Sequence, residues 1–308
     1  MVLPYAAISN SGLEEITMQP VEKCSFCGST SFTKLFEVSI MNMGTNVVRC
    51  RKCGLAFLNP RPGQEEIKTI YAGEYFADRI NPQKLLSQEL SSSGLIKKLR
   101  MYLPEKGRVL DIGAATGAYL AAFKNAGWDV FGVEISDFAR ESAKTTYGIT
   151  TIYPNLETAS FASDYFDFIY MVHVIEHFPE HISLLKEVNR VLKPGGILFI
   201  ATPNFGSPAA AKMKSEWPSL KPDQHLTFFT PKTLKMVLIH SDFKIVKCDT
   251  MQSVIETPHL EKLFGKTKTG YLSKIANKFF PGIKSSIRNI IGKIYPGDSI
   301  EIVAKKIT

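Results

Sequence analysis

The sequence predicts an α/β fold, in which a mostly parallel sheet with helices on both faces follows a small metal-binding module. Two observations support this prediction. Strand-like and helix-like segments alternate from Arg108 onward, and four of the five cysteines form two Cys-x-x-Cys pairs near the start of the chain. Such alternation is typical of a parallel sheet, because each crossover between parallel strands is usually a helix.

The cysteine pairs predict a structural zinc site formed by Cys24, Cys27, Cys50 and Cys53. A glycine follows the second cysteine of each pair, and glycine allows the positive φ of a tight turn that directs two thiolates to one point. Two such turns form a tetrahedral four-cysteine site in which no position is left for water. The alternative of two disulfides is disfavoured in a chain without a signal peptide. We therefore expect zinc to supply folding energy to a module that is too short for a core of its own.

Three regions are expected along the chain. A zinc-ribbon-like four-cysteine domain covers 20–62, a helical linker covers 63–104, and the α/β domain covers 105–308. Two helices are predicted in the linker, over 64–77 and 83–102. The last region carries a basic helical insertion over 257–295, where isoleucines recur at helical spacing among lysines and arginines. This insertion is expected either to cover the substrate pocket or to contact a membrane surface or a lipid-linked substrate.

Composition narrows the class of protein only modestly. Hydrophobic residues make up 44% of the 308 residues and charged residues 21%, as in ordinary globular proteins. No apolar run approaches the ~20 residues of a membrane-spanning helix, and the N-terminus lacks the pattern of a signal peptide, so a cytoplasmic location is expected. The net charge of +8 is compatible with nucleic acid, a phosphorylated small molecule or a membrane surface, and does not choose among them.

The α/β region is predicted to place a ligand at the carboxyl ends of its strands. The loop "DIGAATG" follows the first strand, so that Asp111 ends the strand while Gly113 and Gly117 let a ligand approach the backbone closely. An acid at this point suits a ligand with a cationic amino-acid end. Glu134 ends the second strand, where a carboxylate can accept both hydroxyls of a ribose. Strands are expected over 108–113, 129–136, 149–153, 166–174, 196–204, 243–250 and 299–307, and helices over 118–127, 137–148, 179–192 and 231–240.

With these residues, the sequence resembles the class I S-adenosylmethionine-dependent methyltransferases over about 105–250. The resemblance continues through "FDFIYMVHVIEHF", "EVNRVLKPGGILFIATPN" and "DQHLTFFTPKTLKMVL". The ubiquinone-type O-methyltransferases are the most similar group, and the four-cysteine module resembles that of bacterial methyltransferases that include deoxysugar C-methyltransferases. The resemblance implies a seven-stranded, mostly parallel, Rossmann-like methyltransferase sheet and S-adenosylmethionine as the methyl donor.

The resemblance also implies the cofactor-binding residues. Asp111, Gly113 and Gly117 would line the methionine end, Glu134 would bind the ribose, and the stretch from Asn155 to Glu157 would lie near the adenine. One position departs from the family pattern, because Ala115 stands where such loops usually have a glycine; a positive φ there would cost roughly 1 kcal/mol. The full predicted set is Asp111, Gly113, Ala115, Gly117, Glu134, Asn155, Leu156 and Met171.

The predicted catalytic residues are His173, Glu176, His177 and His225. The first three belong to "YMVHVIEHFPEH", which follows a strand, and His225 belongs to a loop that would cover the pocket. Three interpretations remain open: a divalent metal held by these four residues, a histidine general base, whose unperturbed pKa near 6.5 suits the role, or a glutamate and histidine that only organise the loops. His181 is expected on the solvated outer face of the next helix.

The expected function is methyl transfer to an oxygen of a small-molecule acceptor, either phenolic or sugar-like, by in-line displacement with histidine-assisted or metal-assisted deprotonation. Carbon methylation of a nucleotide-linked sugar is the alternative within the enzyme class. A nucleic-acid modifier or binder is a further alternative, although no RNA-binding motif or aromatic–basic interleaving supports it. A non-catalytic scaffold with a degenerate pocket is the last alternative. The oligomeric state is not predicted.

Overall fold

The computed structural model describes residues 17–40, 42–63, 66, 92–251 and 297–307. The helix predicted over 64–77, apart from residue 66, and the insertion predicted over 257–295 lie outside the described residues. So does the first half of the helix predicted over 83–102, of which residues 92–99 are helical.

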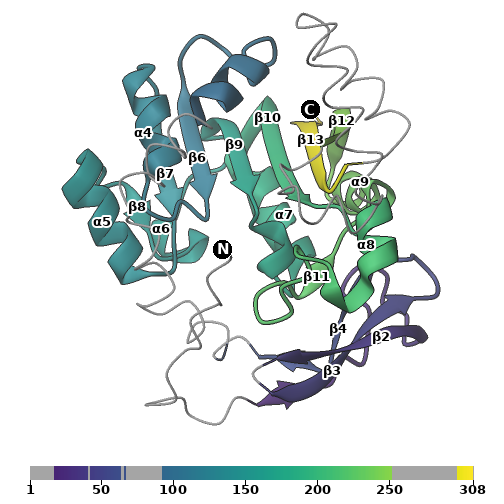
Figure 1. Ribbon diagram of the computed structural model, residues 1–308. Helices are drawn as coiled ribbons and strands as arrows, with labels where there is room; N and C mark the ends of the chain where they lie inside the picture. Colours follow the sequence, from purple (N-terminus) through teal and green to yellow (C-terminus); the bar gives the residue numbers. More distant parts are fainter. Residues whose placement is uncertain (1–16, 41, 64–65, 67–91, 252–296, 308) are drawn as a thin grey trace, which may run out of the picture.

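The main element of the fold is a seven-stranded, mostly parallel sheet, as predicted. Its strand order is β12-β13-β10-β9-β6-β7-β8 (Figure 1). The strands from β8 to β10 pair in parallel, whereas β13 is antiparallel to both of its neighbours. The strands are β6 (Arg108–Ile112), β7 (Asp129–Val133), β8 (Ile152–Tyr153), β9 (Phe166–Val172), β10 (Leu192–Pro203), β12 (Phe243–Met251) and β13 (Ser299–Lys306).

Helices cover both faces of this sheet. Successive residues of a strand point to opposite faces, so the residues of β9 belong to two different cores. On one side, Phe168 and Tyr170 of β9 share a core with residues 92–99, α4 (Ala118–Asn125) and α5 (Asp137–Tyr147). On the other side, Ile169 and Met171 share a core with α7 (His181–Val191) and α9 (Pro231–His240). Thr230 caps α9 as expected, with a reciprocal hydrogen bond to Thr233. The other helices are α6 (Leu156–Ala159), α8 (Pro208–Met213), η1 (Ile175–His177) and η2 (Lys214–Glu216).

The chain leaves β9 earlier than the sequence predicted. The strand ends at Val172, and His173 has a φ of 57°. A single 3-10 turn, η1, follows, and α7 begins only at His181, two residues after the predicted start. This left-handed residue turns the chain away from the sheet plane, so the histidine-rich stretch forms an irregular rim around the carboxyl ends of the strands.

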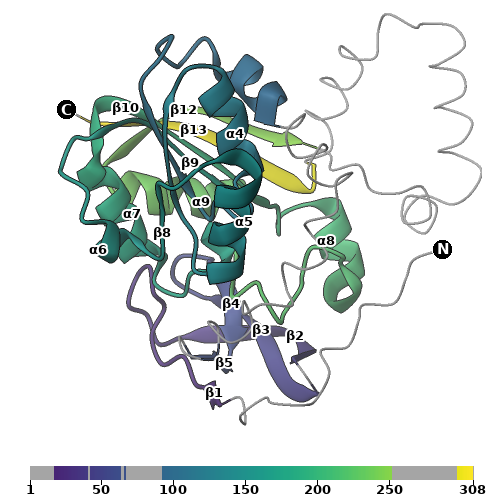
Figure 2. The ribbon, with the colours of Figure 1, turned by 90° about the vertical axis from the view of Figure 1, so that its left-hand side faces the viewer.

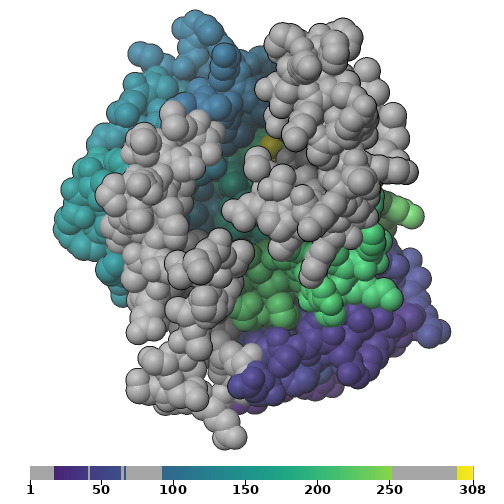
Figure 3. Space-filling view, viewed as in Figure 1, coloured from purple at the N-terminus to yellow at the C-terminus, as the bar shows by residue number. Residues whose placement is uncertain are grey.

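The N-terminal region forms a second, four-stranded sheet that takes one strand from far along the chain. Its order is β11-β4-β3-β2, with β2 (Phe32–Ile40), β3 (Met43–Cys50), β4 (Ala56–Asn59) and β11 (Thr227–Phe228). A separate pair consists of β1 (Met18–Gln19) and β5 (Arg61–Pro62). Figure 2 shows β2, β3 and β4 of this small sheet below α5 and α8, and Figure 3 shows the purple N-terminal residues directly against the green segment.

The N-terminal region and the α/β region share hydrophobic cores, and the α/β region also contributes β11 to the small sheet. Val47 and Leu58 pack in one core with Phe205, Trp217 and Phe228. Leu55 and Phe57, on the opposite face of β4 from Leu58, belong to the large core that contains α7 and α9. The predicted boundaries at 62 and 104 therefore lie between regions that pack together. The division into separate domains stays a prediction.

Candidate active site

A cavity of about 950 Å³ opens at the carboxyl ends of β6, β7, β9 and β10, where the fold predicts a ligand. Its wall combines the loop after β6, the end of β7, the start of α6 and the histidine-rich rim. Of the predicted cofactor residues, the lining contains Asp111, Gly113, Ala115, Glu134, Asn155 and Leu156; of the predicted catalytic residues it contains His173, His177 and His225.

Asp111 lies at the bottom of the cavity and is buried. Burial raises the pKa of this carboxyl to about 8, the Tyr170 hydroxyl lowers it, and Glu134 adds to the increase. Gly113 follows with a φ of 81°, and a Cβ at this position would lie 2.5 Å from a Val174 methyl carbon. Only glycine fits here, because the turn packs closely against Val174, and Gly113 also lines the cavity.

Ala115 has a φ of 46°, so the position that usually holds glycine does require the left-handed conformation. Its amide donates a hydrogen bond to Glu134 Oε2 at 2.9 Å, and the Ser136 amide donates to Glu134 Oε1 at 3.0 Å. The two amides fix the Glu134 carboxylate at the rim of the cavity, and each oxygen keeps a lone pair for a further donor. This arrangement suits a pair of ribose hydroxyls.

Two of the predicted cofactor residues are not among those that line the cavity. Met171 is fully buried on the α7 side of the sheet, because its position in the β9 alternation points it into the core. Gly117 begins α4 with a φ of 79°, and a Cβ there would lie 2.8 Å from the Ala143 Cβ of α5. The glycine at this position thus serves helix packing and turn geometry.

Glu176 is the buried centre of the histidine-rich rim. The Thr202 hydroxyl donates to its Oε2 at 2.8 Å, while Oε1 lies 3.4 Å from His173 Nδ1 and 4.0 Å from His225 Nε2. Burial would raise the pKa of Glu176, but the surrounding histidines, His173 first among them, lower it to about 2. The carboxylate is therefore ionised at neutral pH and aims one oxygen, which has no hydrogen-bond partner, between two imidazoles.

His177 connects the two loops that form the rim. Its Nδ1 lies 2.8 Å from the Gln224 carbonyl oxygen, and its Nε2 lies 3.1 Å from the His173 carbonyl oxygen. A neutral imidazole donates from one nitrogen only, so one of these contacts is a hydrogen bond while the other nitrogen carries the lone pair. Burial lowers its pKa. Its geometry suits the organising role more than that of a general base.

His173 and His225 present their rings differently. His173 keeps 55% of its side chain exposed and lines the cavity, with Nδ1 toward Glu176, which leaves Nε2 for a substrate. His225 is buried, and its Nδ1 donates to the Ser219 carbonyl oxygen at 2.9 Å, so that Nε2 carries the lone pair. Burial lowers the pKa of His225 to about 3, and the ring is therefore neutral.

The rim also meets the first requirements of a metal site. Ligand atoms of Glu176, His177 and His225 lie within 4.8 Å of one another. The unpartnered Glu176 oxygen and the unprotonated His225 nitrogen face each other, and a cation between them would satisfy both. Nitrogen and carboxylate ligands suit Zn²⁺, Mn²⁺ or Fe²⁺ better than Mg²⁺.

His181 is buried, which contradicts its expected solvation. None of its side chain reaches solvent, neither ring nitrogen has a hydrogen-bond partner, and the ring meets Phe229 edge-on at a centroid distance of 5.5 Å. Because α7 starts at this residue, His181 belongs to the first turn of the helix, where it faces the core beside β11 and the N-terminal region.

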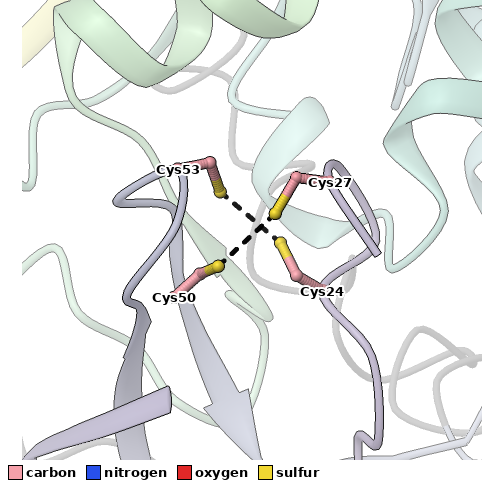
Figure 4. Close-up of side chains that lie close together, drawn as sticks. All are labelled: Cys24, Cys27, Cys50 and Cys53. Carbon is pink, nitrogen blue, oxygen red and sulfur yellow. Dashed lines mark hydrogen bonds between the residues drawn. The ribbon is translucent and has the colours of Figure 1, made fainter. Parts of the chain in front are cut away.

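The four N-terminal cysteines converge as predicted (Figure 4). Cys24 Sγ lies 3.6 Å from Cys53 Sγ, and Cys27 Sγ lies 3.5 Å from Cys50 Sγ, while all five cysteines of the described residues are free of disulfides. A tetrahedral zinc ion with Zn–S bonds of about 2.3 Å requires sulfur atoms about 3.8 Å apart. The arrangement therefore fits one zinc ion with four thiolate ligands.

Several contributors to the site were missed from the sequence. Thr202 holds Glu176, Tyr170 lies beside Asp111, and the carbonyl groups of Ser219 and Gln224 orient two histidines. Thr202 could have been found, because it is near the carboxyl end of β10 at the ligand edge of the sheet. A buried tyrosine and loop carbonyls leave no comparable signal in a sequence.

Fold and cavity together define a class I S-adenosylmethionine-dependent methyltransferase, and the comparisons with known proteins agree. A family model described as "Methyltransferase domain" matches residues 84–248, more than half of the chain. The chain therefore belongs to this methyltransferase family. A methyltransferase structure from Archaeoglobus fulgidus aligns with 76% of this chain and 100% of its own, with a TM-score of 0.52 at 23% identity, which supports the fold.

Curated relatives match a shorter part of the chain. The ubiquinone biosynthesis O-methyltransferase of Actinobacillus pleuropneumoniae serotype 7 is 29% identical over 136 residues, which cover 41% of this chain and 54% of that protein. The biotin biosynthesis bifunctional protein BioHC of Cellvibrio japonicus is 31% identical over 139 residues, 43% of this chain and 27% of that protein. The chain thus spans about half or less of these relatives. In the described part of the chain, no helix has the length and apolar character to cross a membrane.

Proposed function

We propose that this methyltransferase transfers the methyl group of S-adenosylmethionine to a hydroxyl oxygen of a small acceptor, either phenolic or sugar-like. The observation that carries the proposal is the pairing of ionised, buried Glu176 with His173 at the cavity wall. His173 Nδ1 lies 3.4 Å from Glu176 Oε1 without a hydrogen bond. Closer approach of the two groups in the substrate complex would place the proton on Nδ1 and the lone pair on Nε2. The relatives named as ubiquinone biosynthesis O-methyltransferases support the choice of an oxygen acceptor.

The cofactor would lie across the carboxyl ends of β6 and β7. Asp111 suits its ammonium group and Glu134 its ribose hydroxyls, while the cavity wall at Asn155 and Leu156 suits the adenine. When bound, the cofactor supplies an activated methyl group on a sulfonium. The chain's own contribution is to hold the acceptor oxygen in line and to remove its proton.

His173 is the proposed general base. As the C–O bond forms and the S–CH₃ bond breaks, the hydroxyl proton passes to His173 Nε2, and Glu176 stabilises the resulting imidazolium. Thr202 and His177 hold this arrangement in place. His225 closes the opposite side of the pocket, where its neutral ring can accept a hydrogen bond from the acceptor.

The same residues support a metal-assisted form of the reaction. Glu176, His177 and His225 would hold a divalent ion, which would bind the acceptor oxygen and lower its pKa. The unpartnered Glu176 oxygen favours this form. The N-terminal four-cysteine cluster would hold a separate, structural zinc ion.

Methyl-transfer assays with labelled S-adenosylmethionine and panels of phenols, sugars and sugar nucleotides test the proposal, with product analysis to distinguish O- from C-methylation. We expect His173→Ala and His225→Ala each to lower turnover at least about 100-fold while calorimetric cofactor affinity stays nearly unchanged. His240→Ala, on the exposed end of α9, is the matched histidine control. A double variant with full activity would refute the site.

Chelation separates the two forms of the reaction. If activity is lost while the protein retains one zinc, and added Mn²⁺ or Fe²⁺ restores it, the rim binds a catalytic metal. Activity that persists under these conditions supports His173 acting without one.

A further inference from the structure

We propose that the N-terminal four-cysteine module is a positioning device for the active site, which holds His225 and Glu176 in place through β4 and β11. The proposal rests on the proposed function only in that these two residues act in catalysis. Leu58 and Leu226 are the positioning residues, because their backbone groups carry the connection without contacting the cavity.

The connection consists of consecutive backbone hydrogen bonds. The Leu58 amide at β4 donates to the Leu226 carbonyl oxygen at 3.0 Å, and β4 pairs with β11 in antiparallel register, Phe57 opposite Thr227. The Leu226 amide in turn donates to the Glu176 carbonyl oxygen at 2.9 Å. Leu226 directly follows His225, so both functional side chains extend from backbone that β4 holds.

The other end of β4 is tied to the cysteine turns. The Cys50 amide donates to the Leu55 carbonyl oxygen at 2.9 Å, and the Gly54 amide donates to the Cys50 carbonyl oxygen at 2.9 Å. These two bonds form the turn that carries Cys50 and Cys53, and Leu55 is the residue before β4. A metal that fixes the two thiolates would therefore fix the start of β4.

Packing predicts which half of the active site depends on this device. Cys53, Leu55 and Phe57 share a core with Ile175, next to Glu176, and with Phe229, which follows β11. Ala114 of the cofactor turn shares a different core with Leu120 and Ala143, to which no described residue of the N-terminal region belongs. Leu110 and Ile112, on either side of Asp111, do belong to the core that contains Cys53, but the backbone hydrogen bonds through β4 and β11 lead to Glu176 and His225. Loss of the metal should thus disturb the acceptor side and spare much of the cofactor side.

Hydrogen exchange in the full-length protein provides the test. Zinc-stripped protein and Cys27→Ser are compared with the zinc-loaded protein, and Cys248→Ser is the control because this cysteine lies outside the cluster. We expect amides over 224–229 to exchange at least about tenfold faster without the metal, and affinity for S-adenosylhomocysteine to change less than about threefold. Zinc added back to the stripped protein should restore the protection.

Leu58→Pro tests the connection without touching a ligand, since proline lacks the amide that bonds Leu226. It should retain one zinc per chain, show the same faster exchange over 224–229, and lower turnover about 100-fold, as a displacement of about 1 Å at a catalytic group can. Unchanged protection over 224–229 in stripped protein would overturn the proposal. Equal loss of protection over 111–117 would also overturn it, because the metal would then stabilise the whole fold.

The two proposals can fail separately. If no acceptor is methylated or His225→Ala is fully active, the proposed function fails, whereas the exchange measurements still show whether the module holds the loop.

Discussion

The proposed contact between Asp111 and the cofactor's ammonium group would couple cofactor binding to pH. With its pKa raised to about 8 by burial, this group carries a proton in the free protein at neutral pH. A bound ammonium group favours the carboxylate, so cofactor binding should release a proton. Affinity for S-adenosylmethionine is therefore expected to rise with pH up to about 8, by at most about tenfold per unit. Calorimetry in buffers of different ionisation enthalpy measures both the affinity and the proton release.

Asp111→Asn should bind the cofactor more weakly and without this pH dependence, whereas Asp129→Asn, at the exposed start of β7, should behave as wild type. An unchanged pH profile in Asp111→Asn would contradict the assignment.

For single residues, the direction of the side chain decided which predicted residues line the cavity. Asp111 and Glu134 could be placed from the sequence because each ends a strand at the ligand edge of the sheet. Met171 was misplaced because its position in the β9 alternation points it into the α7 core, and His181 was misplaced because α7 begins two residues later than predicted. A shift of one or two residues exchanges a solvent-facing position for a buried one.

Among the elements, the turn between β6 and α4 carries a measurable strain. Ala115 occupies a φ of 46°, which an alanine adopts at a cost of roughly 1 kcal/mol and a glycine at little cost. Ala115→Gly is therefore expected to change the free energy of unfolding by a few tenths to about 1 kcal/mol in the stabilising direction, after the larger chain entropy of glycine is subtracted. Urea denaturation measures the difference.

Ala122→Gly, in the interior of α4, is the control, and it should destabilise by about 1 kcal/mol. A destabilised Ala115→Gly would show that the turn favours alanine for another reason.

Most elements could be predicted because their signals are local: a nearly continuous apolar run marks β9, and capping residues mark α5 and α9. β11 could not. It has two residues, and it is a strand only because β4 lies beside it. The same holds for His173, whose left-handed φ is set by the rim and not by its neighbours in sequence.

At the scale of the whole molecule, the free energy of unfolding is expected to depend on pH because His181 is buried. Burial lowers its pKa to about 4, with a smaller contribution from Arg61, so the folded protein binds this proton less readily than the unfolded chain, whose histidine has a pKa near 6.5. Stability is thus fully present above about pH 6.5 and is lost as pH falls toward 4, by about 3 kcal/mol.

His181→Phe should flatten this dependence and leave the protein equally or more stable at neutral pH, since the imidazole nitrogens make no hydrogen bond. Denaturation at pH 7 and pH 5 checks this, with His240→Phe as the exposed control. An unchanged pH dependence would mean that other buried groups, such as His225, dominate the acid response.

The sequence by itself determined the mostly parallel sheet, the cysteine cluster and the sheet edge at which the proposed cofactor-binding residues gather. Strand–helix alternation, ligand spacing and the end of a strand are properties of short segments. Only the tertiary structure decided that β4 pairs with β11, that His177 bridges two loops and that Glu176 is the buried centre of the histidine rim. These features join residues about 30 to 170 positions apart in the sequence. Their contacts exist only once the hydrophobic cores that bring these segments together have formed.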